Sequence, residues 1–344
     1  MATVEGAAAR LEDWWKVSPS PVFRDIVYAL YTETQSVLKD IHFTENASLQ
    51  KMVGLRITAA GLPTSLTYGK LNDTPARRRT TALHHEEPKF MIRDNVFVDV
   101  RYQGDKKAYE KILKINTKGL FIARTRGIDW DFFNNDPSAA GGLDGGPTGL
   151  FTRLSTSANR DKWGHADECN IDGSNLLMTT SAVKANDLQL FETVDQALQF
   201  TKSPEGTNSV IYGNDRFCRR FATSAKRADN GSGLKTTEDN YHRSVSMYKN
   251  ARIREVGRAA DDVTRIIGNT ENTAGTSLTG GDRTSFYVVH YGEGHLEGEH
   301  DGSLDLKKVG LDDTGTQDVY LLDYLFGMFH SHDRTVARVF GIQM

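Results

Sequence analysis

The pattern of apolar and polar positions predicts a mixed order of helices and strands along the chain. Residues 20–41 begin with Ser20, a good N-cap residue, and with Pro21 at the first helical position. Apolar residues follow at helical spacing, which predicts a helix. Residues 105–133 place apolar side chains at helical intervals and lysines between them, which predicts a long helix. Gly119 and Gly127 weaken this helix, so a kink or break is expected there.

The C-terminal part is rich in predicted strands. Strands are predicted at residues 90–102, "FMIRDNVFVDVRY", and at residues 284–294, "TSFYVVHYGEG". Both segments are rich in apolar and β-branched residues, which is typical of strands. Within residues 318–342 apolar residues lie on both faces of a strand at period two. One face carries Tyr320, Leu322, Tyr324, Phe326 and Met328, and the other carries Val319, Leu321, Asp323, Leu325 and Phe329. A strand that is apolar on both faces is predicted to lie between two layers.

The middle of the chain alternates helix and strand. Helices are predicted at 187–201 and at 214–229, the second capped by Asn214, with strands at 209–213 and 251–257. This order is typical of a compact α/β unit. Polar, glycine-rich stretches at 134–149, 229–240 and 268–282 predict exposed loops. The fold class predicted for the whole chain is α+β.

Residues 61–92, "GLPTSLTYGKLNDTPARRRTTALHHEEPKFMI", are too polar to form a core of their own. Strands are predicted at "SLTYGKL" and "TTALHH", and "NDTP" between them contains strong turn formers. A two-stranded hairpin is marginally stable alone in water. This extended loop is therefore expected to lie on another surface, and that surface is expected to belong to another copy of the chain.

Charged and histidine side chains in the extended loop are the candidate contacts with a neighbouring copy. Arg77, Arg78 and Arg79 form the strongest charge feature, because arginine makes paired hydrogen bonds to carboxylates or phosphates. A solvated turn and a nucleic-acid contact are the alternatives for these arginines. The candidate inter-subunit residues are Lys70, Arg77, Arg78, Arg79, His84, His85, Glu86 and Glu87.

Composition narrows the function classes. The chain has 344 residues, 42 Lys+Arg against 45 Asp+Glu, and a net charge of −3, which argues against a dedicated nucleic-acid binder. Its two cysteines, Cys169 and Cys218, form no CxxC pair and predict neither a disulfide framework nor a zinc site. Neither a signal peptide nor a membrane-spanning run is recognisable, so a soluble protein made in a cytoplasm is expected.

Histidines and glutamates near the C-terminus are the main candidate for chemistry. His330 and His332 stand two apart on a predicted strand and are expected to point the same way. The wider set is His290, Glu293, His295, Glu297, Glu299, His300, His330 and His332. Its spacing matches no HExxH-type motif, which favours scattered surface or interface histidines over a metal site. No catalytic, cofactor-binding or metal-binding residue is predicted, and the chain is not expected to be an enzyme.

Three short motifs, in order, carry a resemblance to a known family. "GLPTSLTYGKLN" begins the extended loop, "NDPSAAGGLDG" follows the long helix, and "TSFYVVHYGEG" precedes the closing strands. Over residues 20–343 the chain resembles the major capsid proteins of tailed bacteriophages, which have the Hong Kong 97-like fold.

The resemblance implies five parts of the subunit. These are an N-terminal arm (1–60), the extended loop (61–92), a peripheral domain with a long spine helix (93–150), an axial domain (151–285), and return strands that complete both domains (286–344). About sixty residues precede the loop, so a separate scaffolding protein is expected. Lys70 lies in the loop, but no matching motif supports the lysine–asparagine crosslink of some relatives.

The resemblance also implies a function and partners. The chain would assemble as pentamers and hexamers into an icosahedral virion head in the host bacterial cytoplasm. It would enclose double-stranded DNA, contacted non-specifically, with a portal, possible decoration proteins and no membrane. Three alternatives stay open. They are the shell protein of an encapsulin-like nanocompartment, a metal-dependent hydrolase that uses the histidine-rich C-terminal region, and a capsid-associated decoration or tail protein.

Overall fold

The computed structural model describes most of the chain in three β-sheets and their helices. The described residues are 9–10, 36–45, 51–57, 82–138, 146–179, 183–203, 206–227, 234–238, 244–292, 294–301 and 305–344. Their strands form a six-stranded, a seven-stranded and a two-stranded sheet. The predicted α+β class is confirmed.

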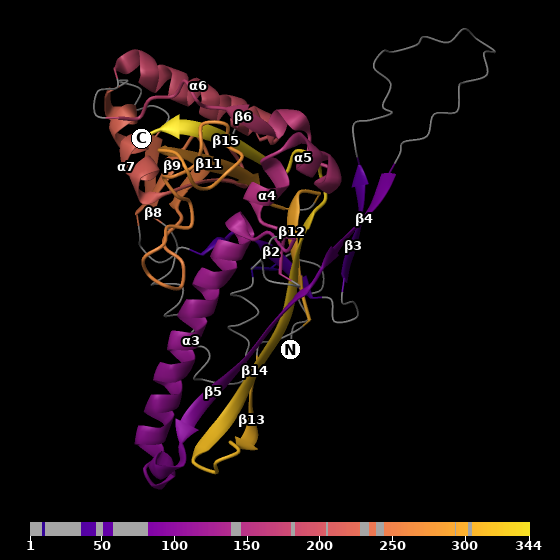
Figure 1. Ribbon diagram of the computed structural model, residues 1–344, viewed down its shortest axis with the longest axis vertical. Helices are drawn as coiled ribbons and strands as arrows, with labels where there is room; N and C mark the ends of the chain where they lie inside the picture. The colour runs from indigo at the N-terminus through magenta and orange to yellow at the C-terminus, as the bar shows by residue number, and fades with distance from the viewer. Residues whose placement is uncertain are drawn as a thin grey trace, which may run out of the picture.

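The six-stranded sheet and one long helix form the elongated lower part of the molecule in Figure 1. Its strands are β1 (Ala9–Arg10), β2 (His42–Glu45), β5 (Phe90–Asp99), β12 (Leu296–His300), β13 (Asp305–Leu311) and β14 (Gln317–His330). The central strand, β14, pairs with β5, β12 and β13, all antiparallel. A short 3-10 helix, η2 (Val100–Gly104), leads from β5 toward the long helix.

The long helix, α3 (Lys106–Asn134), runs unbroken along one face of this sheet. The predicted helix is confirmed, whereas the expected break at Gly119 or Gly127 is wrong. Asp105 caps the helix by accepting from the backbone N–H groups of Lys107 and Ala108. A glycine costs a helix only about 1 kcal/mol relative to alanine, and contacts with the sheet stabilise the helix.

Polar contacts show which face of the sheet lies against α3. The Tyr109 hydroxyl lies 2.6 Å from the Asp318 carboxylate and 2.7 Å from the Tyr320 hydroxyl, and Arg124 pairs with Asp94. The even-numbered residues of β14 therefore face α3, and Leu322, Tyr324, Phe326 and Met328 are buried. On the odd-numbered face Val319, Leu321, Asp323 and Leu325 are only half-buried. The predicted second covering layer is absent from the described part of the chain.

The seven-stranded sheet forms the upper part of the molecule in Figure 1. Its spatial order is β6 (Asn170–Asp172), β15 (Val336–Gln343), β11 (Arg283–His290), β7 (Ser209–Gly213), β10 (Ala251–Glu255), β9 (Ser244–Tyr248) and β8 (Leu234–Glu238). The helices α6 (Lys184–Phe200) and α7 (Asp215–Arg227) cover one face. Both predicted helices are confirmed, and Asn214 caps α7 by accepting from Phe217 N at 2.7 Å.

Both faces of the central strands of the seven-stranded sheet are buried. On one face Phe286 and Val288 pack in a cluster with Phe191 and Phe217 of the covering helices. On the other face Tyr287 joins a cluster that includes Phe133 of α3. All five residues of β7 are buried, as expected of a strand between two layers.

Other sequence predictions need correction. Of the helix predicted over 20–41, only 37–39 is described as helical, as the 3-10 turn η1 (Val37–Lys39), and residues 20–35 lie outside the described part. Residues 234–238, predicted as loop, form β8. Four helical segments were not predicted: η2, α4 (Leu150–Leu154), α5 (Ser157–Trp163) and η3 (Asp167–Cys169).

Candidate inter-subunit surfaces

The two-stranded sheet is a hairpin that projects to one side of the body in Figure 1. It consists of β3 (Lys51–Ile57) and β4 (Ala82–Pro88), paired antiparallel from Lys51 opposite Pro88 to Ile57 opposite Ala82. Neither strand joins either larger sheet. The hairpin thus begins ten residues before the extended loop predicted at 61, because β3 pairs with the predicted "TTALHH" strand.

Only some of the predicted contact residues lie in the described part of this hairpin. Lys70 and the arginines 77–79 lie outside the described residues, as does the predicted strand 65–71. His84, His85 and Glu86 lie in β4, opposite Leu55, Gly54 and Val53 of β3. Their role in contacting a neighbour stays a prediction.

Glu87 has its charge partner inside the subunit. Its carboxylate is 1% exposed and pairs with Arg153 of α4, with Arg153 Nη2 2.5 Å from Glu87 Oε2. The His330 backbone N–H donates to Glu87 Oε1 at 3.3 Å, and the Arg153 guanidinium lies 4.5 Å from the centre of the Trp163 ring. A buried charge needs such a partner, since leaving it unpaired costs several kcal/mol.

A second ion pair lies just beyond the end of the hairpin. The ammonium of Lys89, whose side chain is fully buried, lies 3.2 Å from Glu299 of β12. Glu87 and Lys89 together attach the base of the hairpin to α4 and to the six-stranded sheet. The base is therefore held by buried charge pairs, while the hairpin strands have no partner strand beyond each other.

The half-buried face of the six-stranded sheet is the second candidate surface. Antiparallel pairing places Phe97 beside Val319 and Met91 beside Leu325 on the side away from α3. Phe97 is 43% and Met91 56% exposed. Between them Arg93 and Asp323 form an ion pair at 2.8 Å, also on β5 and β14. We call this set of residues the outer sheet face.

A groove borders the outer sheet face. It has a volume of about 560 Å³ and lies between the first residues of β5, the second half of α3 and residues 259–264. Phe90, Met91, Ile128 and Trp130 supply its apolar lining. Asp131 is partly buried at the same place, and the loss of solvent raises the pKa of its carboxyl group to about 6.

The two large sheets are joined by residues 36–45. Asp40, which is buried, accepts from the Tyr212 hydroxyl at 2.6 Å and lies 2.8 Å from Arg254 of the seven-stranded sheet. Asp129 of α3 accepts from Ser36 Oγ at 2.8 Å and from Val37 N at 2.9 Å. Burial raises the pKa of Asp129 to about 7. β2, in the same segment, pairs in parallel with β12 of the six-stranded sheet.

Three histidines stack where the chain passes between the sheets. The ring centres of His290 and His295 are 3.9 Å apart, those of His295 and His332 are 5.6 Å apart, and Lys202 Nζ lies 2.8 Å from His332 Nε2. Burial is the largest cause that lowers the pKa of His295, and the charges of His290, His332 and Lys202 lower it further, to about 4. His330 instead packs edge-on against His165. The expectation that His330 and His332 point the same way is wrong, because β14 ends at His330.

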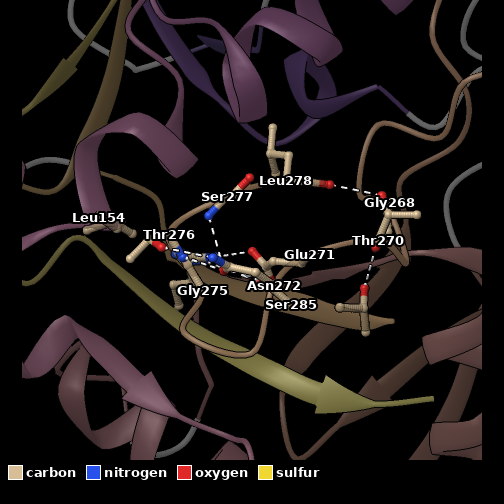
Figure 2. A network of polar contacts seen from close by, with 12 residues as sticks. Leu154, Gly268, Thr270, Glu271, Asn272, Gly275, Thr276, Ser277, Leu278 and Ser285 are labelled. Carbon is tan, nitrogen blue, oxygen red and sulfur yellow. Dashed lines mark hydrogen bonds and ion pairs between the residues drawn. The ribbon is translucent and has the colours of Figure 1, made fainter. Parts of the chain in front are cut away.

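The predicted exposed loop 268–282 is built on a buried ion pair. Arg338 of β15 is fully buried and pairs with Glu271, and Arg338 also donates to the Gly275 carbonyl at 2.8 Å. Figure 2 shows Glu271 and Ser285 in this network, with Asn272 Oδ1 accepting from the backbone N–H groups of Thr276 and Ser277. Gly275 has φ +66°, a conformation that favours glycine. Part of the segment is therefore ordered and buried.

Neither cysteine is chemically activated. Both are free thiols, and burial raises the pKa of Cys169 and of Cys218 to about 12, so both stay protonated at neutral pH. Among the described residues, no group of three or more His, Cys, Asp or Glu side chains is placed to hold a metal ion. None of the described helices has the length and apolar character to span a bilayer.

Solved structures share this fold, although no protein-family model and no curated protein matches the chain. The holo-SrpI encapsulin of Synechococcus elongatus PCC 7942 is 11% identical over 99% of this chain and 93% of its own, with TM-score 0.55. The capsid of an empty GTA particle is 12% identical over 91% of each chain, with TM-score 0.53. The capsid of Ralstonia phage GP4 is 10% identical over 89% of this chain and 88% of its own, with TM-score 0.50.

These matches cover nearly the whole length of both partners in each comparison. The chain therefore has the fold of capsid and encapsulin shell subunits, and the capsid-like fold expected from the three short motifs is confirmed. At identities near one in ten the likeness shows the fold alone.

Proposed function

We propose that this chain is the major capsid protein of a tailed bacteriophage, which assembles into a closed shell around double-stranded DNA. The observation that carries the proposal is the outer sheet face. β14 is apolar on both faces, yet over residues 318–326 the described chain buries only one of them. A repeated neighbour would cover the other face, as the subunits of a closed symmetric assembly do.

The projecting hairpin supports the same proposal. β3 and β4 form a two-stranded sheet, which is marginal in isolation, and the hairpin is anchored at its base by Glu87 and Lys89. Such an arm suits a contact in which each subunit reaches over the next one. The six-stranded sheet with α3 would be the peripheral domain, and the seven-stranded sheet with α6 and α7 the axial domain.

An encapsulin-like shell is the second candidate, because the Synechococcus encapsulin matches 99% of this chain. Both candidates predict closed shells, and they differ in contents. The capsid reading adds a separate scaffolding protein, a portal and packaged DNA, whereas the encapsulin reading predicts a protein cargo. The motifs "GLPTSLTYGKLN" and "NDPSAAGGLDG", which resemble tailed-phage capsid proteins, favour the first.

The direct test is to express the chain alone and with its candidate scaffold, and to image the product by cryo-electron microscopy. We expect closed icosahedral shells of pentamers and hexamers. Particles from infected cells should contain nuclease-protected double-stranded DNA. A monomer or small oligomer under all these conditions would rule out both candidates, and a protein cargo without DNA would favour the encapsulin.

The extended loop can be tested separately. Changing Arg77, Arg78 and Arg79 together to Ala should leave subunit folding intact but impair assembly, if these arginines bind acidic groups on a neighbour. The measurement is the fraction of protein in shells by sedimentation, with urea unfolding of the unassembled subunit as the folding control. Normal assembly of the triple variant would remove the arginines from the contact.

A further inference from the structure

Three histidines and one lysine meet where the chain crosses between the two large sheets. His290 is the last residue of β11 in the seven-stranded sheet, and His295 directly precedes β12 in the six-stranded sheet. His332 lies in the return crossing from β14 to β15, and Lys202 follows α6. The His295 ring stacks on both other rings, whose centres are 3.9 Å and 5.6 Å away. We call these four residues the crossing stack.

The backbones of the two crossings are joined at the same place. The Ser331 N–H donates to the His295 carbonyl at 2.8 Å, and the His290 N–H donates to the Thr335 carbonyl at 2.9 Å. Each bond connects the crossing from β11 to β12 with the crossing from β14 to β15. The crossing stack and these two hydrogen bonds therefore form one joint.

The contacts of the three rings suit neutral imidazoles. Lys202 Nζ lies 2.8 Å from His332 Nε2, and because an ammonium can only donate, this contact requires an unprotonated Nε2. His295 Nδ1 is buried, and no described residue forms a hydrogen bond with it, so a charge on this ring would lack a partner. His290 Nδ1 lies 3.1 Å from the Thr201 carbonyl, which satisfies the one N–H of a neutral ring.

Charged side chains from neighbouring segments adjoin the crossing stack. Asp333 Oδ1 lies 2.6 Å from His332 Nδ1, so this carboxylate favours a charge on His332. The Glu297 carboxylate accepts from the backbone of the turn before β12, and the Arg334 guanidinium lies 5.1 Å from the centre of a ring at the end of α6. Glu293, in the same turn, lies outside the described residues. Asp333 is therefore the described carboxylate that pairs with the stack.

We infer that the crossing stack is an acid-sensitive latch, which holds the two crossings together at neutral pH and releases them when its rings are protonated. Two charged rings with centres 3.9 Å apart repel each other, and the Lys202 ammonium adds a third positive charge. Among the described residues no carboxylate pairs with His290 or His295, so their protons are not compensated. Residues 36–45 would still connect the two sheets after release, so a fixed joint would become a hinge. All these groups lie within one subunit, so the latch does not depend on assembly into a shell.

The test follows hydrogen–deuterium exchange of full-length, unassembled subunits at about pH 7 and about pH 4.5, with times scaled for the intrinsic pH dependence of amide exchange. The amides of His290 and Ser331 are hydrogen-bonded across the joint and report its opening. A histidine with a pKa of about 4 in the closed joint and about 6.5 in the open joint would favour opening by about 50-fold over this interval. We therefore expect protection at residues 290–296 and 330–336 to fall at least about tenfold, while β7 keeps its protection. Unchanged protection at the joint, or an equal loss in β7, would overturn the inference.

The main variant removes two proton-binding sites and keeps the rings. His290→Phe/His295→Phe retains aromatic stacking, so its joint should lose less than about threefold of its protection on acidification. The matched control is His84→Phe/His85→Phe, which makes the same chemical change in β4 of the hairpin. This control should respond to acid as wild type does. Equal responses of the two variants would overturn the inference.

A second variant covers the case in which the double phenylalanine variant does not fold. Lys202 is exposed and has φ +55°, a conformation that asparagine adopts more readily than most residues. Lys202→Asn removes the ammonium, so charged rings are less disfavoured in the closed joint. Measured against its own protection at about pH 7, its acid-induced loss should be at least about twofold smaller than that of wild type. A loss equal to that of wild type would overturn the inference.

Shell formation is scored separately by electron microscopy. Shells built from subunits whose joint does not respond to pH would contradict only the latch. An acid-sensitive joint in subunits that form no shell would contradict only the proposed function.

Discussion

The two large sheets of this subunit differ in how many of their faces the subunit itself buries. In the seven-stranded sheet, residues of β7 and β11 alternate between two buried clusters, so both faces have a core. In the six-stranded sheet, α3 covers one face and the outer sheet face is half-buried. The first sheet is complete within one chain. The second has the strand composition of a two-sided sheet, but among the described residues only one layer covers it, which is why we assign the other layer to a neighbour.

The largest expected loss of stability comes from a cavity-forming substitution in the core between α7 and β11. Phe217 is fully buried and stacks on Phe286 with ring centres 4.9 Å apart. Phe217→Ala should lower the free energy of unfolding by about 3–5 kcal/mol, because the cavity cannot close around the lost ring. Urea unfolding of the unassembled subunit measures this loss. A change below about 1 kcal/mol would mean that the core between α7 and β11 is not packed as described.

The base of the hairpin should be the next most sensitive place. Arg153→Met leaves the Glu87 carboxylate buried without its cation and should cost about 3–5 kcal/mol. Adding Glu87→Gln to this variant should recover part of the loss, because a neutral amide is cheaper to bury. The double-mutant cycle by urea unfolding gives the coupling energy. If the two losses simply add, Glu87 and Arg153 do not act as a pair.

On the outer sheet face the expected effects on stability and assembly diverge. Met91→Thr with Phe97→Thr should change subunit stability by less than about 1 kcal/mol, since both side chains are already exposed and threonine suits a strand. Shell formation should fall severely, because the apolar contact with a neighbour is lost. The control is Val183→Thr with Leu188→Gln, which removes exposed apolar groups next to the two-sided sheet. Equal assembly by both variants would contradict the role of the outer sheet face.

The smallest expected effect is on the pH dependence of the unfolding free energy, and it comes from titratable residues where the two large sheets meet. The pKa of His295 is lowered to about 4, so the folded state binds fewer protons than the unfolded state. Its stabilising contribution is complete above about pH 6.5 and is lost as the pH falls toward 4. His295→Phe keeps an aromatic ring and should flatten the dependence of unfolding free energy on pH over this range, as measured by urea unfolding at several pH values.

Asp129 provides a control of opposite sign. Its pKa is raised to about 7, so the folded state binds more protons than the unfolded state between about pH 4 and 7. The contribution of Asp129 to the unfolding free energy therefore falls as the pH rises through this range. Because Asp129→Asn removes this contribution, the stability of the variant should rise more steeply with pH. If both substitutions shift the slope in the same direction, the charge states assigned to this region are wrong.

Local pattern predicted most of the secondary structure, and it failed where a distant contact decided the outcome. The spacing of apolar residues predicted α3, α6, α7, β5 and β14, because helices and strands each impose their own period on a core-facing side. Residues 268–282 are polar and glycine-rich, yet Glu271 is buried because Arg338 lies opposite it. Nothing within fifteen residues of Glu271 indicates that partner.

The candidate site shows the same division. The polarity of residues 61–92 indicated an arm in need of a partner surface, but Glu87 appeared equivalent to the charged residues before it. The structure buries Glu87 against Arg153, 66 positions away. The apolar composition of both faces of β14 was visible in the sequence, whereas the bare outer sheet face was not, because sequence period does not tell which side α3 will cover.

The sequence by itself determined most of the helices and strands and the two apolar faces of β14. These depend on the period of side chains along a single element, which the order of residues states directly. Only the tertiary structure decided which sheet is complete, where Glu87 finds its charge partner and how His290, His295 and His332 come to stack. These depend on contacts between residues far apart in the chain, and such contacts exist only once the elements have packed.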